Sequence, residues 1–193
     1  MDLTQGSDSN KFARAKKMML WFGIISMVMT FAGLTSAYVV SKSRPDWLTE
    51  FELPNAFYWS TLVIVASSIT FYLSKRSIAS SKPKNATALL LGTLILALLF
   101  VALQFQGFTD IISQGYFFTG SESSITTSFI YVLVLVHLAH LAGGLIVLLV
   151  IIYNHFKQRY RPGQMLGIEL GATYWHFVDF LWVYLFLFLY FFK

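Results

Sequence analysis

Five long stretches of the chain carry almost no charged side chains, and this feature restricts the fold more than any other. A helix that crosses a membrane needs about 20 mainly apolar residues. The stretches predict such helices over about residues 18–40, 56–73, 86–105, 126–153 and 171–192. They do not alternate apolar and polar residues, as the strands of a membrane barrel would. We therefore expect an all-α integral membrane protein, a bundle of five transmembrane helices.

The composition excludes several other classes of protein. Charged residues make up 12% of the 193 residues, against about 25% in an ordinary globular domain. Apolar residues make up 56%, more than the polar surface of a soluble domain could cover. The chain has no cysteine, so a disulfide framework, an iron–sulfur cluster and a thiolate zinc site are excluded. A soluble enzyme is therefore not expected.

The basic residues predict how the helices are oriented. Eleven of the 14 Lys and Arg residues lie before the first apolar stretch, between the second and third, or between the fourth and fifth. By the positive-inside rule we expect a cytoplasmic N-terminus and a periplasmic C-terminus. Residues 1–17 would form a basic cytoplasmic segment, and residues 18–193 a single membrane domain. This topology accounts for the net charge of +5 without a nucleic-acid partner.

Ionisable side chains inside the apolar stretches carry most of the functional information. An ionised Asp near the bilayer centre costs about 2.5–3.5 kcal/mol on insertion scales, so Asp179 should have a partner. His176 precedes Asp179 by three residues on the same helical face, and we expect the two to hydrogen-bond. Glu169 lies two turns before His176, and His137 and His140 form a similar pair on the fourth predicted helix. These residues would hold the fourth and fifth predicted helices together as an antiparallel hairpin.

Three roles are open for these residues. His137, His140 and His176 with a carboxylate could ligate zinc or iron, although His-x-x-His alone is a weak motif. Intramembrane Asp and His also act as proton relays, but this cluster does not cross the whole membrane. The third role is structural: hydrogen bonds between helices and contacts with lipid headgroups or a partner chain. We favour the structural role.

The sequence of residues 174–182, Y-W-H-F-V-D-F-L-W, resembles the Y-W-H-F-V-D-x-x-W signature of cytochrome c oxidase subunit III. Further similarities occur in the same order along the chain: F-A-G at 31–33, L-P-N at 53–55, L-Q at 103–104, His137 and His140 followed by Gly144, and Glu169. The commonest form of this family has seven helices, and this sequence resembles its short five-helix bacterial form. It departs from the family at Met27 and near Gly107, where the family has Glu residues.

The resemblance implies a subunit without a catalytic centre, a metal ligand or a cofactor of its own. Haem and copper would lie in partner subunits of a proton-pumping haem–copper oxidase of aerobic respiration. The chain would pack mainly on subunit I and also meet subunit II, bind phospholipids, support proton uptake and stabilise the enzyme during turnover. A larger respiratory supercomplex is a further partner that the resemblance allows. The implied location is the bacterial inner membrane, with several spans.

The resemblance and the ionisable pattern together select eight residues for structural, lipid or subunit contacts. They are His137, His140, Glu169, Tyr174, Trp175, His176, Asp179 and Trp182. Two alternatives stay open. The chain could be the subunit III homologue of a quinol oxidase or of a nitric oxide reductase system. It could also be a free-standing proton or ion transporter, although it lacks the inverted repeats of that class.

Overall fold

The computed structural model describes residues 8–44, 47–48, 53–118, 124–160 and 165–192. Their regular structure consists of α1 (Asp8–Ser41), α2 (Asn55–Ala79), α3 (Pro83–Ser113), α4 (Ile125–Phe156) and α5 (Leu166–Phe192). All five helices are long and apolar enough to cross a membrane. The prediction of an all-α membrane protein with five spanning helices is confirmed.

The helices extend beyond the uncharged stretches from which they were predicted. Helix α1 begins at Asp8 rather than near residue 18, because Lys, Arg and Ala in the basic segment are themselves good helix formers. Its 34 residues make about 50 Å of helix, whereas the hydrocarbon core of a bilayer is about 30 Å thick. Helix α5 begins at Leu166, so that Glu169 lies in its first turn.

Local sequence explains where the other helices begin. Pro83 lies at the start of α3, where a missing backbone N–H leaves no hydrogen bond unmade. At the start of α4, the Ser124 hydroxyl accepts a hydrogen bond from the backbone N–H of Thr127, which satisfies one of the free donors of the first turn.

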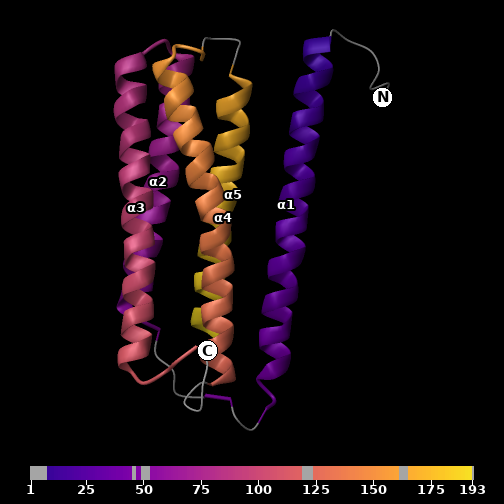
Figure 1. Cartoon of the computed structure of the whole chain (residues 1–193), viewed down its shortest axis with the longest axis vertical. Coiled ribbons are helices and arrows are strands. Elements are labelled where there is room, and N and C mark those ends of the chain that lie inside the picture. The colour runs from indigo at the N-terminus through magenta and orange to yellow at the C-terminus, as the bar shows by residue number, and fades with distance from the viewer. Residues whose placement is uncertain (1–7, 45–46, 49–52, 119–123, 161–164, 193) are drawn as a thin grey trace.

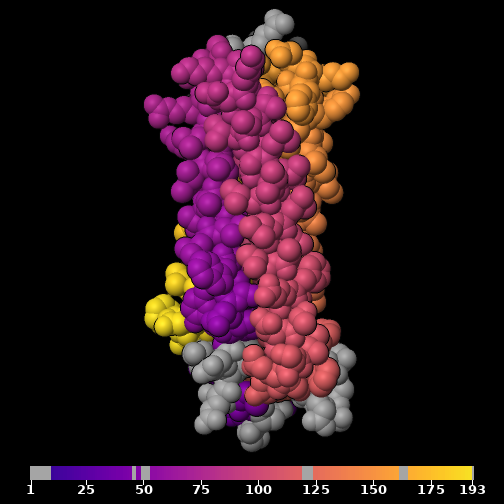
Figure 2. All heavy atoms as spheres, turned by 90° about the vertical axis from the view of Figure 1, so that its left-hand side faces the viewer, coloured from indigo at the N-terminus to yellow at the C-terminus, as the bar shows by residue number. Residues whose placement is uncertain are grey.

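Helices α2 to α5 form a four-helix bundle, and α1 packs against α4 and α5. Figure 1 shows α1 standing on one side of the bundle and leaning away from it toward its N-terminal end. On the opposite side, α2 and α3 lie side by side along their lengths (Figure 2). Helix α5 contacts α2, α4 and α1, and α4 contacts α3, α5 and α1, so these two helices join α1 to the rest of the bundle.

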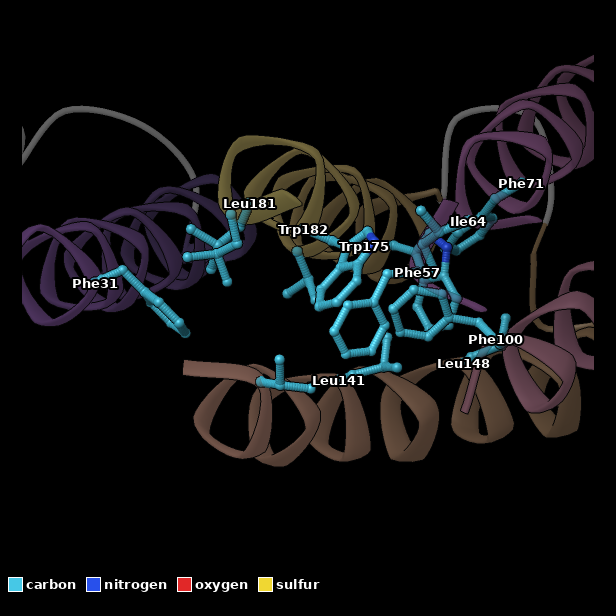
Figure 3. Close-up of a cluster of buried hydrophobic side chains, with 14 of the residues drawn as sticks. Phe31, Phe57, Ile64, Phe71, Phe100, Leu141, Leu148, Trp175, Leu181 and Trp182 are labelled. Atoms are coloured by element: carbon cyan, nitrogen blue, oxygen red, sulfur yellow. The ribbon is translucent and has the colours of Figure 1, made fainter. Parts of the chain in front are cut away.

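Aromatic side chains fill the interior of the bundle (Figure 3). The Trp182 ring of α5 lies edge-on to Phe57 of α2 and Phe100 of α3, with centroids 5.8 and 5.2 Å apart. Trp175, two turns earlier in α5, has a similar contact with Phe71 of α2 at 6.0 Å. Edge-to-face pairs of this kind add stabilisation beyond the area that they bury.

Helix α1 is attached along one narrow stripe. Its buried residues recur at intervals of three or four positions, which places them on one helical face. They are Ile24, Met27, Phe31, Thr35 and Tyr38. The other faces of α1 expose large apolar side chains, as expected of a helix that meets lipid or another membrane protein.

Two glycines allow helices to approach closely. A Cβ atom at Gly107 of α3 would overlap the Phe57 ring, whose Cδ1 would be 2.9 Å away. A Cβ atom at Gly171 of α5 would overlap Ile151 of α4. At Gly33 of α1, by contrast, no atom lies within 4 Å of the Cβ position. Only particular glycines therefore mark helix contacts.

Candidate functional site

The signature segment, residues 174–182 of α5, sends two buried indole groups toward α2. Trp175 Nε1 donates to Ser67 Oγ at 3.1 Å, and Trp182 Nε1 donates to Thr61 Oγ1 at 3.1 Å. Both indoles are only 1% exposed. Because the two tryptophans are seven residues apart, they lie on one face of α5. This face joins α5 to α2.

His176 also bonds to α2, and not to Asp179 as the sequence suggested. Its Nδ1 forms a 2.6 Å hydrogen bond with Ser68 Oγ. Asp179 is 3% exposed, and neither carboxyl oxygen has a hydrogen-bond partner among the described residues. The Ser68 hydroxyl also approaches the Asp179 carboxyl, but without hydrogen-bond geometry. The expected His176–Asp179 hydrogen bond was therefore wrong.

Tyr174 connects α5 to α4 through one backbone group. Its hydroxyl donates to the carbonyl oxygen of His140 at 2.9 Å. Below the ring, a Cβ atom at Gly144 would lie 3.3 Å from Tyr174 Cε1 and 3.4 Å from Trp175 Cε3. The contact between α4 and α5 here consists of ring packing and this bond. Hydrogen bonds between ionisable side chains, which the sequence suggested for this hairpin, do not form it.

The two histidines of α4 lie in separate surroundings. His137 is fully buried, with ring centroids 5.1 Å from Trp182 and 5.9 Å from Phe100. Neither of its ring nitrogens has a partner among the described residues. His140 donates from Nδ1 to the Val136 carbonyl oxygen at 2.7 Å, within its own helix. The structure therefore does not gather these histidines with His176.

Glu169 belongs to a different contact. Its Oε2 lies 3.4 Å from Nζ of Lys17 on α1, and both side chains are about half exposed. Ten residues separate Glu169 from Asp179, which corresponds to about 15 Å along a helix. Glu169 thus links α5 to α1 near one end of the bundle. An exposed pair of this kind contributes about 0–1 kcal/mol.

The described part of the chain contains no group of three or more His, Cys, Asp and Glu side chains that could hold a metal ion. The candidate ligands of the sequence-based metal hypothesis are divided among the α4 interior, the α2–α5 contact and the α1–α5 contact. What the arrangement can do is hold helices together through neutral hydrogen bonds and packed rings.

The sequence analysis did not select the small polar residues of α2, several of which form hydrogen bonds to α5 or α3. Ser60, Ser67 and Ser74 are fully buried, and they are spaced by seven residues, which keeps them on one face. Gln104 of α3 donates from Nε2 to Ser60 Oγ at 2.9 Å. Thr70 Oγ1 lies 2.9 Å from Thr93 Oγ1 of α3 in a further hydrogen bond. The seven-residue spacing of small polar side chains was the signal available.

Comparison with known proteins identifies the family. The family model for cytochrome c oxidase subunit III matches residues 3–193, nearly the whole chain. The chain belongs to the cytochrome c oxidase subunit III family. The resemblance predicted from the signature segment is thereby confirmed, and relatives of this subunit III chain occur in bacteria and in vertebrates.

Three relatives illustrate the extent of the similarity. A probable cytochrome c oxidase subunit 3 of Mycobacterium leprae is 31% identical over 170 residues, which cover 86% of this chain and 82% of that protein. The cytochrome c oxidase subunit 3 of Papio hamadryas is 27% identical, with 96% and 73% covered. That of Petromyzon marinus is 28% identical, with 86% and 66% covered. This subunit III chain therefore spans about two thirds to four fifths of the length of these relatives.

The family assignment relates the chain to a membrane-bound oxidoreductase complex. Its relatives are subunits of cytochrome c oxidase, an oxidoreductase complex, and the five apolar helices make it a multi-pass membrane protein. In this subunit III chain, the signature segment bonds mainly to α2. The family signature thus coincides with the residues that fasten α5 into the bundle.

Proposed function

We propose that this chain is the non-redox subunit III of a proton-pumping haem–copper terminal oxidase, a cytochrome c oxidase of aerobic respiration. The observation that supports this proposal most is that the side chains of the signature segment, residues 174–182, form hydrogen bonds between helices. Its indoles, hydroxyl and imidazole hold α5 against α2 and α4. Electron transfer belongs to the haem and copper of partner subunits, and this chain contributes no catalytic residue.

The proposed partners are subunit I, as the main contact, and subunit II. The helices expose apolar side chains over much of their surface; Met29 of α1 and Phe180 of α5, for example, are about 70% exposed. Such surfaces suit lipid or another membrane protein. Family membership implies a complex with other oxidase subunits. Through that contact the chain supports proton uptake and slows inactivation during turnover. A respiratory supercomplex is a further setting for the same interactions.

We place the chain in a bacterial inner membrane with a cytoplasmic N-terminus. Lys17 and Lys75 line one hollow at the α1–α2–α5 end of the bundle, and Lys75 and Arg76 line the next. Figure 1 has the N-terminus of α1 and the C-termini of α2 and α4 at the same end. Basic residues at one end support the positive-inside orientation. They also suit the anionic headgroups of phospholipids, at about 1 kcal/mol for each Lys or Arg.

The eight residues selected from the sequence then have structural roles. Tyr174, Trp175, His176 and Trp182 form hydrogen bonds between helices, and Glu169 pairs with α1. His137 and His140 fill space beside aromatic rings. Neither carboxyl oxygen of Asp179 has a hydrogen-bond partner among the described residues.

Gentle purification through an affinity tag on this chain tests the proposal. We expect haem-bearing subunits to copurify in a fixed ratio, with the absorption spectrum of a haem–copper oxidase and cytochrome c oxidation in the eluate. Oxidation of quinol instead of cytochrome c would favour the quinol oxidase alternative, and nitric oxide reduction would favour the reductase system. A chain that purifies alone and moves protons or ions in liposomes would contradict the proposal.

A further inference from the structure

A groove of about 490 Å³ lies between α2 and α5 on the surface of the bundle. We call it the α2–α5 groove. Its lining is apolar except for Tyr72 and three groups that lie together, Ser68 of α2 and His176 and Asp179 of α5. Among the described residues, no Lys or Arg side chain lines it. His176 is therefore the lining group that becomes a cation by taking up a proton.

The Asp179 carboxyl lies at the centre of a long apolar helix. Thirteen residues separate it from each end of α5, Leu166 and Phe192, which is about 20 Å of helix on either side. The side chain is 3% exposed. An ionised carboxylate in such surroundings is costly unless a cation compensates it. The carboxyl therefore either holds a proton or is balanced by a charged His176.

Ser68 links the two ionisable groups of α5. Its Oγ forms a 2.6 Å hydrogen bond with His176 Nδ1, and the same hydroxyl approaches the Asp179 carboxyl. Neither carboxyl oxygen has a formed hydrogen bond among the described residues, so a small side-chain rotation completes this second bond. A hydroxyl donates one hydrogen bond and accepts two. Ser68 can therefore accept from His176 and donate to Asp179, or accept from a protonated Asp179 and donate to His176.

The His176 ring connects this pair to the Lys75 end of the bundle. Tyr72 lines both the α2–α5 groove and the adjoining hollow that contains Lys75 and Glu169, so the two spaces share a wall. Lys75 is near enough to act on His176 electrostatically. The His176 ring is only partly buried, and its Nε2 is not one of the enclosed, unpartnered atoms. A proton that enters from this end therefore reaches His176 before it reaches the carboxyl.

We infer that Asp179 is a proton-binding site of this chain, loaded from the Lys75 end of the bundle through His176 and Ser68. In the transfer, the Nδ1–H bond of the imidazolium breaks as its proton passes to Ser68 Oγ, and the proton of the Ser68 hydroxyl passes to an Asp179 oxygen. The imidazolium and the carboxylate become a neutral imidazole, which keeps its Nε2 proton, and a carboxylic acid. The reverse transfer releases the proton. This inference deepens the proposed support of proton uptake, and it rests on that proposed function only for how the proton is used.

The charges around the pair favour this direction of transfer. Lys75 of α2 repels a positive charge on His176, so it favours passing the proton on to the carboxylate. Glu169 of α5 is paired with Lys17 of α1 at 3.4 Å. On α4, His137 and His140 pack against aromatic rings, and neither lines the groove.

Infrared spectra of the purified complex in H₂O and D₂O test the site. A protonated carboxyl in apolar surroundings gives a carbonyl band that a carboxylate lacks. We expect such a band, which is lost in Asp179→Asn and shifts on deuteration about tenfold or more faster than the backbone amides of α5 exchange, since the relay does not need the helix to open. A band that is absent at both neutral and acidic pH, or that shifts at the rate of those amides, would overturn the inference.

Two variants test the route, and a third is the matched control. Ser68→Ala removes the hydroxyl, and His176→Gln keeps a hydrogen-bonding group without a nitrogen that takes up a proton. Each should slow deuteration of the carboxyl about tenfold, the factor that corresponds to one lost hydrogen bond. Ser67→Ala removes the neighbouring hydroxyl, which bonds Trp175 outside the groove, and should not slow it. A wild-type rate in either Ser68→Ala or His176→Gln, each folded by circular dichroism, would overturn the route.

The infrared band that Asp179→Asn removes belongs to this chain, so the result does not depend on the partner subunits. If the tagged chain recovers no haem, the proposed function fails, and the exchange rate of the Asp179 carboxyl still decides the proton site. If haem is recovered but the carboxyl exchanges only with the amides, the proposed function stands and this inference fails.

Discussion

Replacing Ser67 by Ala should destabilise the bundle more than the loss of one small hydroxyl suggests. Ser67 is fully buried and accepts the hydrogen bond of the Trp175 indole at 3.1 Å. Without the hydroxyl, a buried N–H is left unpaired, which costs about 1–3 kcal/mol. In the reverse case, Trp175→Phe removes the donor and leaves a serine. That serine can bond a carbonyl of its own helix, as Ser60 and Ser74 already do.

A double-mutant cycle isolates this bond from the loss of packing. Hydrogen bonds between membrane helices average about 0.6 kcal/mol and reach about 1.7 kcal/mol, so we expect a coupling free energy of about 1 kcal/mol between Ser67→Ala and Trp175→Phe. The free energies of unfolding are measured in mixed micelles by far-UV circular dichroism. Thr30→Ala is the control, since its hydroxyl donates to the carbonyl oxygen of Ser26 within the same helix. A coupling below about 0.3 kcal/mol, the scatter expected of independent sites, would refute this account of the α2–α5 contact.

Three further outcomes follow from the same contacts. Gly171→Ala should destabilise the bundle by about 1–3 kcal/mol through overpacking against α4. Gly33→Ala is the control and should not destabilise it, because no atom lies within 4 Å of the Cβ position at Gly33. Equal melting temperatures of the two variants would contradict this prediction. His137→Leu should change the unfolding free energy by less than about 1.5 kcal/mol, because the buried ring has no hydrogen-bond partner among the described residues and is replaced at similar volume. Loss of oxidase activity from a folded variant would argue for a proton or ligand role instead. Glu169→Gln should lower the free energy of unfolding by less than about 1 kcal/mol, since the ion pair with Lys17 is exposed to solvent. A larger loss of stability in a thermal melt would contradict this and show that the ion pair is shielded from water.

The sequence predicted the existence of every spanning helix, but it predicted their ends less well. Uncharged stretches locate the part of a helix that contacts lipid. They do not locate its last turns, because charged residues such as Lys16 and Lys17 form helix readily outside the hydrocarbon. With α5 beginning at Leu166 rather than near residue 171, Asp179 lies in the middle of its helix.

The partners of the signature segment depend on how the helices are arranged around the bundle. Helices α4 and α5 are neighbours in sequence, which favoured a contact between their ionisable side chains. The structure places α2 against α5 as well, and Ser67 and Ser68 are then closer partners for Trp175 and His176. A spacing of three residues brought His176 and Asp179 to one face, but it could not exclude a competing hydroxyl from another helix.

Close packing was also beyond the reach of sequence reasoning. Gly107 and Gly171 lie under side chains of neighbouring helices, whereas Gly23 and Gly33 face open space. All four lie in apolar helices, and nothing in their local sequence separates them. The difference arises only when Phe57 and Ile151 are brought against them by the fold.

The central claim is that this chain holds helices and partners together while electrons travel through other subunits. Its most direct test is to detach the chain from the purified complex with detergent and to measure haem, copper and cytochrome c oxidation in both fractions. We predict that all haem and copper stay with the remaining subunits, whose initial rate persists but declines faster during turnover. Haem or copper recovered with this chain, or an immediate loss of electron transfer, would contradict the account.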